Sequence, residues 1–502
     1  MNEGPLDEDA HNSETDDSAG GDPPESSLKR AFDIGLERQT AGDFDGAIRA
    51  WRAILLQNPD SVAAMNNLGI ALRHEGRIAE SEAVLRAGLE REPLNPELLV
   101  SLGQTRLQWG RLDEAEKDFI RASSLAPRLP GAHHALGILY LQRNRPEDAI
   151  RAFRAEISAD PKSITGLLAM SDVQALVGNL DDAAENLRRA VKLEPENRTA
   201  HLRIAELLLL AGDYPGGFRE MEWRWRGTPW EETHPEIPLW EGAALNGRTL
   251  LVDCDGGFSE TLLLIRLLRP GGPCGEGRIL VRCRPALIEL LHGCRWLDSV
   301  SSLEEPPPSL ADMGCPLAMI PQLTGMGIED VTDGVPYLRP DPSALAPWRA
   351  RLPSSGLPVG LCWSGGEGDI PLAAFKPLAE IPGIQLVSLQ KGEARREIRD
   401  CGFDILDLGA ELDEGPGAFV DSAAVIHQLP LTVSTQTPVA HLAGALDRPV
   451  WIVLPHTPHW CFGLDEETTP WYPSARLFRP GMRETSSSVI TRLAQKVASL
   501  LG

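Results

Sequence analysis

The sequence contains no apolar run that approaches the ~20 residues needed to cross a bilayer, so we expect no membrane span. The first basic residue is Lys29 and no apolar stretch precedes it, so we expect no secretory signal and a cytoplasmic protein. Positive charge is also scarce. The chain has 48 lysines and arginines but 72 aspartates and glutamates, which gives a formal net charge of −24. This excess would repel nucleic acid and anionic membranes, so neither is an expected partner.

Cysteine is absent from the first 250 residues, and the later cysteines form no CxxC pair. They are Cys254, Cys274, Cys283, Cys294, Cys315, Cys362, Cys401 and Cys461. The spacing of zinc ligands is therefore missing, and we expect no metal site. Several of these cysteines lie within apolar runs, which predicts free and mostly buried thiols.

Residues 1–27 have almost nothing apolar to bury and are rich in serine, glycine, proline and acidic side chains. Such a composition predicts a disordered tail. Two interpretations of its role stay open: a solvated leader that keeps the protein soluble, or a docking tail for a basic partner.

From residue 28 onwards, the same residue types recur every 34 positions. Prolines stand at Pro59, Pro93, Pro127, Pro161, Pro195 and Pro229. A small column contains Gly35, Gly69, Gly103, Gly137, Ser171 and Ala205, and a turn column contains Gly42, Gly76, Gly110, Asn144, Gly178 and Gly212. A second small column (Ala47, Ser81, Ala115, Ala149, Ala183, Gly217) is followed by a bulky one (Trp51, Leu85, Phe119, Phe153, Leu187, Met221). This periodicity predicts a helical solenoid.

Each column has a physical role in paired antiparallel helices. Small residues allow two helices to approach closely, and we expect the bulky residue to fill the groove between a hairpin and its neighbour. Glycine or asparagine in the turn column suits the left-handed conformation that ends a helix, and proline stops the second helix. The pattern resembles the tetratricopeptide repeat over residues 28–231, in about six units. It implies a concave groove for a protein partner or acceptor.

After the repeats, short β-rich runs alternate with helical stretches. The predicted strands are 249–254, 278–283, 358–363, 384–389, 431–435 and 449–454, and helices are expected at 259–269, 284–293, 417–428 and 437–446. Strands that are apolar throughout and separated by helices predict parallel sheets covered on both faces. The proline-rich stretch 337–357 divides this half into two lobes with a ligand cleft at the carboxyl ends of the strands.

Four tryptophans, Trp223, Trp225, Trp230 and Trp240, mark the junction. They either bury the end of the solenoid or offer a stacking platform for a sugar.

Several segments of this half resemble the heptosyltransferase-like glycosyltransferases, that is, glycosyltransferase family nine with the GT-B fold. The matching segments are TLLVDCDGGFSET, GLCWSGG, VSLQKG, TVSTQTPVAHLAGALDRPVWIVLP and TPWYPSARLFR. The EWRW junction further resembles bacterial proteins that carry tetratricopeptide repeats ahead of such a domain. The resemblance covers about 240–500. It implies two Rossmann-like lobes and metal-independent, inverting transfer of a sugar from a nucleotide-diphosphate donor, without a cofactor.

The resemblance also assigns residues in the first lobe. The family's glycine-rich turn corresponds to Gly257-Phe258-Ser259-Glu260, which makes Glu260 the expected catalytic base and Gly257 and Ser259 donor-binding residues. The alternative interpretation of Glu260 is a charge favoured by the helix dipole.

In the second lobe, the turn from Ser434 to His441 is expected to hold the diphosphate. Thr437 and His441 match the family's pattern, and Gln436 stands where the family commonly has an aspartate. All three are expected donor-binding residues. Lys391 is either the cation near the donor or an exposed turn lysine, and Ser364 and Gly365 are expected to border the sugar.

The loop after Trp363 is shorter than in the relatives and carries Glu367 and Asp369 in place of a basic residue, which is expected to repel a diphosphate.

The sequence thus predicts four segments: a tail (1–27), the solenoid (28–236), an N-terminal lobe (237–345) and a C-terminal lobe (346–502). The expected function is transfer of a sugar to a protein or surface-glycan acceptor that the repeats recruit. The alternative is a catalytically inactive transferase fold that acts as a protein-binding scaffold.

Overall fold

The computed structural model describes residues 24–227, 230–331, 334–366, 368–415, 417–464, 467–481 and 484–501. Most of the predicted tail, Pro229 and Glu367 lie outside these ranges. The first helix begins at Pro24, inside the segment predicted as tail. The chain divides into two compact units, Met1–Gly166 and Leu167–Gly502. This division falls within the predicted solenoid, and the four-segment boundaries stay a prediction.

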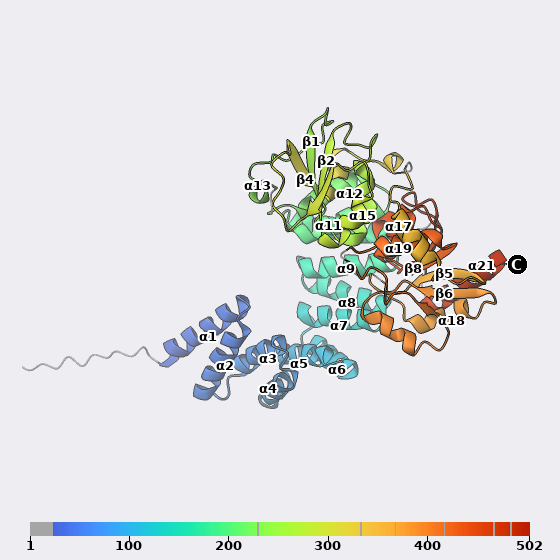
Figure 1. The fold of residues 1–502 in the computed structure, drawn as a ribbon. Coiled ribbons are helices and arrows are strands. Elements are labelled where there is room, and N and C mark those ends of the chain that lie inside the picture. Colours follow the sequence, from blue (N-terminus) through green and yellow to red (C-terminus); the bar gives the residue numbers. More distant parts are fainter. Residues whose placement is uncertain are drawn as a thin grey trace, which may run out of the picture. The chain divides into compact units, whose positions relative to one another are not determined.

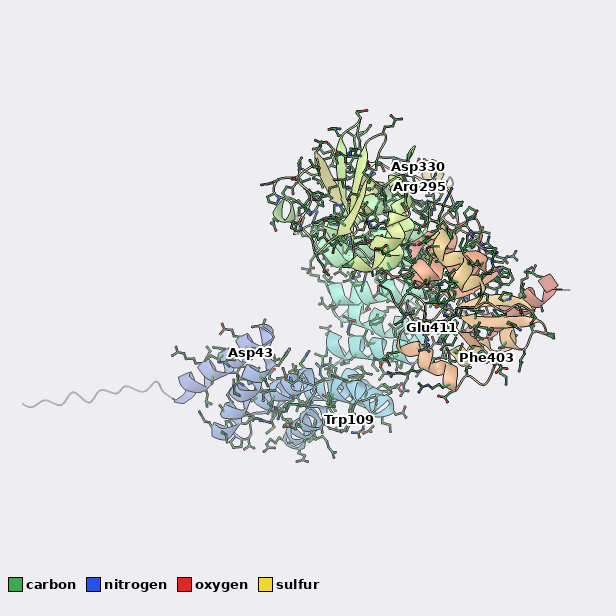
Figure 2. All side chains as sticks on the ribbon, viewed as in Figure 1. Asp43, Trp109, Arg295, Asp330, Phe403 and Glu411 are labelled. Carbon is green, nitrogen blue, oxygen red and sulfur yellow. The ribbon has the colours of Figure 1, made fainter. Side chains whose placement is uncertain are left out.

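The described part of the first unit contains four helical hairpins (Figure 1). Their helices are α1 (Pro24–Thr40), α2 (Phe44–Gln57), α3 (Val62–His74), α4 (Ile78–Arg91), α5 (Pro96–Gln108), α6 (Leu112–Leu125), α7 (Pro130–Gln142) and α8 (Pro146–Ala159). Polar caps start several of them; Asp43 accepts a bond from the amide of Gly46 at 2.8 Å, and Asn95 from that of Leu98 at 3.1 Å. Figure 2 marks Asp43 at the start of α2 and Trp109 at the end of α5.

The turn column has the conformation that the sequence predicts. Gly42, Gly76 and Gly110 have φ values of 78°, 72° and 77°, and Asn144 takes the same left-handed region at 53°. This conformation ends the first helix of each hairpin and lets the chain reverse. The predicted role of the column is confirmed.

The bulky column packs within its own hairpin as well as against the next one. A Cβ placed on Gly35 would meet Trp51 at 2.8 Å, and one on Gly69 would meet Leu85 at 2.5 Å. Gly103 and Gly137 are covered in the same way by Phe119 and Phe153. Each bulky side chain therefore lies on the glycine of its own hairpin. Trp51, Leu85 and Phe119 also share a core with the first helix of the next hairpin, as predicted.

The second unit begins with the last repeats and continues into an α/β region. The repeat helices are α9 (Ile164–Leu176), α10 (Leu180–Leu193), α11 (Arg198–Leu210) and α12 (Tyr214–Glu220). Two short helices follow, the 3-10 helix η1 (Met221–Arg224) and α13 (Trp230–Thr233). They carry the EWRW junction into the first strand.

The first sheet is parallel with the order β3-β2-β1-β4. Its strands are β1 (Thr249–Asp253), β2 (Arg278–Cys283), β3 (Ser299–Ser302) and β4 (Met313–Pro316). The helical segments beside it are α14 (Phe258–Leu264), η2 (Ile265–Leu268), η3 (Pro285–Leu287), α15 (Ile288–His292), η4 (Leu317–Met319), α16 (Ile320–Leu323) and η5 (Ile328–Asp330). β1 is buried along its whole length, which agrees with its apolar residues Leu250, Leu251 and Val252.

The second sheet is also parallel, with the order β10-β9-β8-β5-β6-β7. Figure 1 labels its strands β5, β6 and β8. The strands of this sheet are β5 (Leu357–Cys362), β6 (Ile384–Ser388), β7 (Leu406–Asp407), β8 (Leu431–Thr435), β9 (Val450–Val453) and β10 (Ala475–Phe478). Its helical segments are α17 (Pro342–Arg349), η6 (Leu372–Phe375), α18 (Lys376–Ala379), η7 (Glu393–Arg399), α19 (Val420–Gln428), α20 (Pro438–Ala445), η8 (Trp460–Phe462) and α21 (Ser486–Leu501). Parallel sheets with helices are thus present, as predicted.

One hydrophobic core connects the last repeat with both sheets. Leu209 and Tyr214 of the repeats share it with Leu262 of α14, Leu442 of α20 and Trp471. Trp471 donates a hydrogen bond to the hydroxyl of Tyr214 at 3.1 Å, and Tyr337 donates one to the carbonyl of Leu262 at 2.6 Å. The end of the solenoid is therefore built into the α/β region.

Within the described ranges, no helix is both long and apolar enough to cross a membrane.

Candidate functional site

A cavity of about 630 Å³ in the second unit brings repeat residues and α/β residues together, and we call it the Glu260 cavity. Asp172, Leu202, Arg203 and Glu206 line it from α9 and α11, the first helices of two successive hairpins. Arg224 and Glu260 line it from η1 and α14, and residues 457–460 line it from the loop that follows β9. First helices thus line the cavity, and the groove of the repeats is predicted on the same side of the hairpins.

Glu260 lies in the first turn of α14, directly after β1 and its glycine turn. Its Oε2 atom accepts a hydrogen bond from Nη1 of Arg224 at 2.5 Å. A Cβ on Gly256 would overlap the Glu260 carboxylate, so only glycine leaves room for this arrangement. Burial lowers the pKa of Arg224, but the bond to Glu260 and the charges of Glu260 and Asp255 together outweigh burial, so the pKa lies above its ordinary value. In this structure the predicted base is held in an ion pair.

A second ion pair lines the repeat side of the cavity. Arg203 Nη2 lies 2.9 Å from Asp172 Oδ2. Burial raises the pKa of Asp172, and the charge of Arg203 partly offsets that effect. The Nη1 atom of Arg203 is buried and has no hydrogen-bond partner among the described residues. The cavity wall therefore retains a donor for a bound acceptor group.

His459 connects the cavity to the turn that precedes His441. The backbone N–H of His459 donates to Oε1 of Gln436 at 2.8 Å, and the rings of His459 and His441 lie 6.3 Å apart. Burial lowers the pKa of His459 to about 4, although part of its surface remains open at the cavity. It is therefore neutral near pH 7 and able to accept or donate a hydrogen bond, but it carries no charge for an anion.

His441 itself is enclosed. Its side chain is buried, and Nδ1 lies 2.9 Å from the hydroxyl of Tyr472. Burial, together with the charge of His459, lowers the pKa of His441 to about 3. A neutral, enclosed imidazole does not supply positive charge to a diphosphate.

The other predicted residues of the second lobe form a polar cluster at the carboxyl ends of β5, β6 and β8. Gln390 accepts bonds from the amides of Trp363 and Ser364, both at 3.0 Å, and donates to the carbonyl of Ser364 at 2.9 Å. Thr437 is buried and its hydroxyl lies 2.8 Å from that of Ser434. These polar groups satisfy one another within the protein.

The shortened loop folds on itself. Asp369 accepts a bond from the hydroxyl of Ser364 at 2.6 Å and from the amide of Gly365 at 3.0 Å. A Cβ on Gly366 would overlap the carbonyl of Gln436, so the loop lies against the turn before His441. The Asp369 carboxylate serves as a cap for its own loop.

Lys391 lies apart from the cavity. Its ammonium donates to the carbonyl of Leu412 at 2.5 Å and to Glu414 at 2.7 Å. These two bonds favour the interpretation of Lys391 as a turn lysine, because they connect it to the neighbouring loop of Leu412 and Glu414.

Of the predicted site residues, Glu260 lines the cavity directly and Gln436 supports it through His459. Gly257 and Ser259 share the first turn with Glu260, because Gly257 caps α14 and Ser259 follows it. Ser364 bonds to Gln390 and Thr437 to Cys362 instead, while the amide of Gly365 donates to Asp369. All of these roles stay predictions.

The sequence analysis did not single out Arg224, His459 or Gln390. Arg224 could have been noticed, because it is the arginine between the two tryptophans of the EWRW junction. His459 and Gln390 had a weaker signal, because each follows a predicted strand, where parallel sheets place functional residues.

The four junction tryptophans are mostly engaged in the protein. Trp230 and Trp240 are buried, and Trp223 stacks on His201 with ring centroids 3.8 Å apart. Trp230 also stacks on His234, which lies beside the buried pair of Arg282 and Asp253. The burial interpretation fits Trp230 and Trp240, whereas Trp223 and Trp225 are both half-buried.

All eight cysteines are free and buried, as predicted. Among the described residues, no three histidine, cysteine, aspartate or glutamate side chains are grouped closely enough to hold a metal ion.

Comparison with known proteins confirms the repeats. The tetratricopeptide repeat family model matches residues 32–96, 76–130, 100–164 and 168–219. The N-terminal ~220 residues of the chain are therefore tetratricopeptide repeats, and such repeats indicate a protein partner. The glycosyltransferase resemblance of 240–500 stays a prediction.

Among curated proteins, Protein FlbA of Caulobacter vibrioides is 31% identical over 160 residues. The match covers 28% of this chain and 25% of FlbA, so the chain spans about a quarter of that relative. Among solved structures, MamA is 25% identical with a TM-score of 0.28, over 34% of this chain and 94% of MamA. A tetratricopeptide repeat protein of Thermus thermophilus is 18% identical with a TM-score of 0.34, over 36% of this chain and 99% of that protein.

Proposed function

We propose that this chain binds an extended segment of a protein partner in its repeat groove and holds the end of that segment in the Glu260 cavity. The observation that carries the proposal is the lining of this cavity, where groove residues of α9 and α11 meet the loops that follow β1 and β9. Leu202, Leu207 and Leu210 supply apolar contact, while Asp172, Glu206 and Arg203 supply polar contact. Such a mixture suits a peptide, whose backbone and side chains need both.

Site-specific photo-crosslinking tests the binding proposal. A photoreactive amino acid replaces Leu202, which lines the cavity, and in the control it replaces Arg188, whose exposed side chain lies on α10. Both proteins are irradiated in the native host, and the crosslinked peptides are identified by mass spectrometry. We expect one recurrent peptide at position 202 that is missing at position 188. Equal labelling at both positions would contradict a specific groove.

Sugar transfer to the bound segment is the second candidate function. It is favoured by the position of Glu260, because the expected base opens into the cavity that would hold the acceptor. A hydroxyl at that place would lose its proton to Glu260 while it attacks the sugar of a nucleotide-diphosphate donor, and the nucleoside diphosphate would leave. No metal or cofactor takes part in this proposal.

The inactive scaffold is supported by the arrangement of the donor residues. Glu260 is paired with Arg224, His441 is enclosed and neutral, and Lys391 is bound to Glu414. A transferase of this kind would have to free Glu260 and hold the diphosphate with backbone amides alone. For this reason partner binding comes first in the proposal and transfer second.

Calorimetric titration with nucleoside diphosphates and their sugars separates the two candidates. If transfer occurs, at least one donor binds, and Glu260→Gln lowers the release of nucleoside diphosphate by roughly 10²-fold or more. Glu222→Gln is the matched control, because Glu222 lies on η1 near Arg224 but does not line the Glu260 cavity. If no donor binds while the crosslink at position 202 persists, the scaffold is the function.

A further inference from the structure

A second cavity, of about 510 Å³, lies between the edge strand β10 and the C-terminal helix α21, and we call it the β10–α21 cavity. Four of its lining residues are basic and one is acidic: Arg476, Arg479, Arg492 and Lys496 against Glu467. This local excess of positive charge contrasts with the net charge of −24 of the whole chain. A cavity lined by one sign of charge raises the local concentration of ions of the opposite sign. Small anions would therefore be attracted to this cavity, although the protein as a whole is acidic.

Two of the four cations form a fixed wall. Arg479 donates to the carbonyls of Phe462 at 2.6 Å and Gly463 at 3.0 Å, which sets the direction of its guanidinium. Arg492 donates to the carbonyl of Arg479 at 2.6 Å and to Glu484 at 3.1 Å. These bonds fix the directions of both guanidinium groups, and the charge of Arg492 is paired with the carboxylate of Glu484.

The other two cations, Arg476 and Lys496, form fewer polar contacts with the described residues. Arg476 lies over the ring of Trp451, and the nearest carboxylate oxygen of Glu467 is 3.8 Å away, beyond hydrogen-bond distance. The ammonium of Lys496 has no hydrogen bond or ion pair to any described residue, while Asp465 and Glu466 lie outside the described ranges. Arg492 and Lys496 are four residues apart on one helix face, where like charges repel each other. An anion between them would remove that repulsion.

We propose that the β10–α21 cavity binds a small phosphate-bearing molecule. Guanidinium groups match phosphate oxygens with paired hydrogen bonds, and Lys496 adds a mobile point charge. The volume is that of a small-molecule site rather than of a protein interface. Aromatic stacking contributes little here, because Phe478 is buried in the core. Recognition therefore rests on the phosphate groups and not on a base.

The competing interpretation is that these cations protect the exposed edge of β10 from pairing with another strand, as charged side chains often do on edge strands. That role needs no ligand. It accounts for charge on β10 itself, where Arg476 lies, but not for Arg492 and Lys496 on α21.

The test is calorimetric titration of the full chain with inorganic pyrophosphate at low ionic strength. We expect one binding event that Arg476→Gln combined with Lys496→Gln weakens by about tenfold or more, because two charge-assisted bonds are lost. The matched control combines Lys376→Gln with Arg396→Gln, which removes the same charge from exposed pairs with Glu380 and Glu393 on the same lobe. Glu467→Gln is expected to tighten binding, because it removes the carboxylate that lines the cavity.

Three outcomes overturn the proposal. Pyrophosphate does not bind at millimolar concentration, it binds equally to both double variants, or it is displaced equally well by chloride at the same ionic strength. Circular dichroism of each variant verifies that the fold is intact. The proposal does not depend on sugar transfer, because a donor bound near Glu260 would survive the Arg476 and Lys496 changes.

Discussion

At the scale of single residues, the packing of a hairpin depends on the absence of a side chain at Gly137. Phe153 covers Gly137 so closely that a Cβ would overlap its ring. Gly137→Ala is expected to lower the free energy of unfolding of the first unit by about 1–3 kcal/mol, the usual cost of overpacking a buried contact. The shift in the urea midpoint of the helical circular-dichroism signal measures it.

Gly131 provides the control on the same helix. A Cβ there would meet nothing within 4 Å, and alanine favours the helix over glycine by up to about 1 kcal/mol. Gly131→Ala should therefore leave the midpoint unchanged or raise it. If both alanine variants change stability in the same direction, the close contact with Phe153 does not exist in solution.

The buried imidazole of His441 predicts a dependence of stability on pH. Its folded pKa is lowered to about 3 by burial, while an unfolded histidine titrates near 6.5. Between these values the unfolded chain holds one proton more than the folded chain, so stability is lost as the pH falls below about 6.5. The loss from pH 7 to pH 5 should be roughly 2 kcal/mol for this one group. Urea unfolding at several pH values measures the slope.

The variant His441→Gln should reduce that slope, whatever its effect on stability at pH 7. An unchanged slope in His441→Gln would mean that the ring is protonated in the folded state.

At the scale of elements, the turn between the two helices of a hairpin depends on a left-handed residue. Gly110 has φ = 77°, and Asn144 occupies the corresponding place one repeat later with φ = 53°. Gly110→Ala should destabilise the first unit by about 1 kcal/mol, because a Cβ disfavours this region. Asn144→Gly should be neutral or slightly stabilising. The two midpoint shifts, measured side by side in urea, test the equivalence of the turns.

Loss of the same stability in both variants would contradict that equivalence, because it would assign a contact to the Asn144 side chain that the turn geometry does not require.

The sequence predicted the elements whose pattern is strong and missed those whose pattern is weak. The 34-residue period determined the hairpins, and apolar strands such as β1 and β8 lie at the predicted positions. The short strand β3 (SVSS) is polar and partly exposed, and β4 (MGCP) is short and contains glycine and proline, so neither has a strand-like pattern. β10 was recognised only as part of a motif.

The candidate site was predictable in part for the same reason. Motif and strand position pointed to Glu260 and to the turn before His441, which are local features. The pairing of Arg224 with Glu260 joins residues 36 positions apart, and the bond from His459 to Gln436 joins residues 23 apart. Such long-range contacts depend on how α14, η1 and the loop after β9 pack, and no local pattern records that packing.

At the scale of the whole molecule, the repeat pattern and the compact units disagree. The sequence period runs without interruption to about residue 231, whereas the second compact unit begins at Leu167. Leu209, Tyr214 and Phe218 of the last hairpin belong to the core of the α/β region. Packing of that kind should make α10, α11 and α12 unfold with the sheets rather than with the earlier repeats.

Hydrogen exchange of two variants tests whether these helices unfold with the sheets or with the earlier repeats. Gly137→Ala weakens the first unit, and Asp253→Ala weakens the second, because it leaves Arg282 buried without its partner at a cost of roughly 3–5 kcal/mol. We expect amides of α10–α12 to exchange faster in Asp253→Ala and at an unchanged rate in Gly137→Ala. The double variant should combine both effects additively, since the sites share no partner. Faster exchange of α10–α12 in Gly137→Ala would instead mean that all the repeats unfold together. In that case the stability of each hairpin would depend on the hairpins next to it and not on the α/β core.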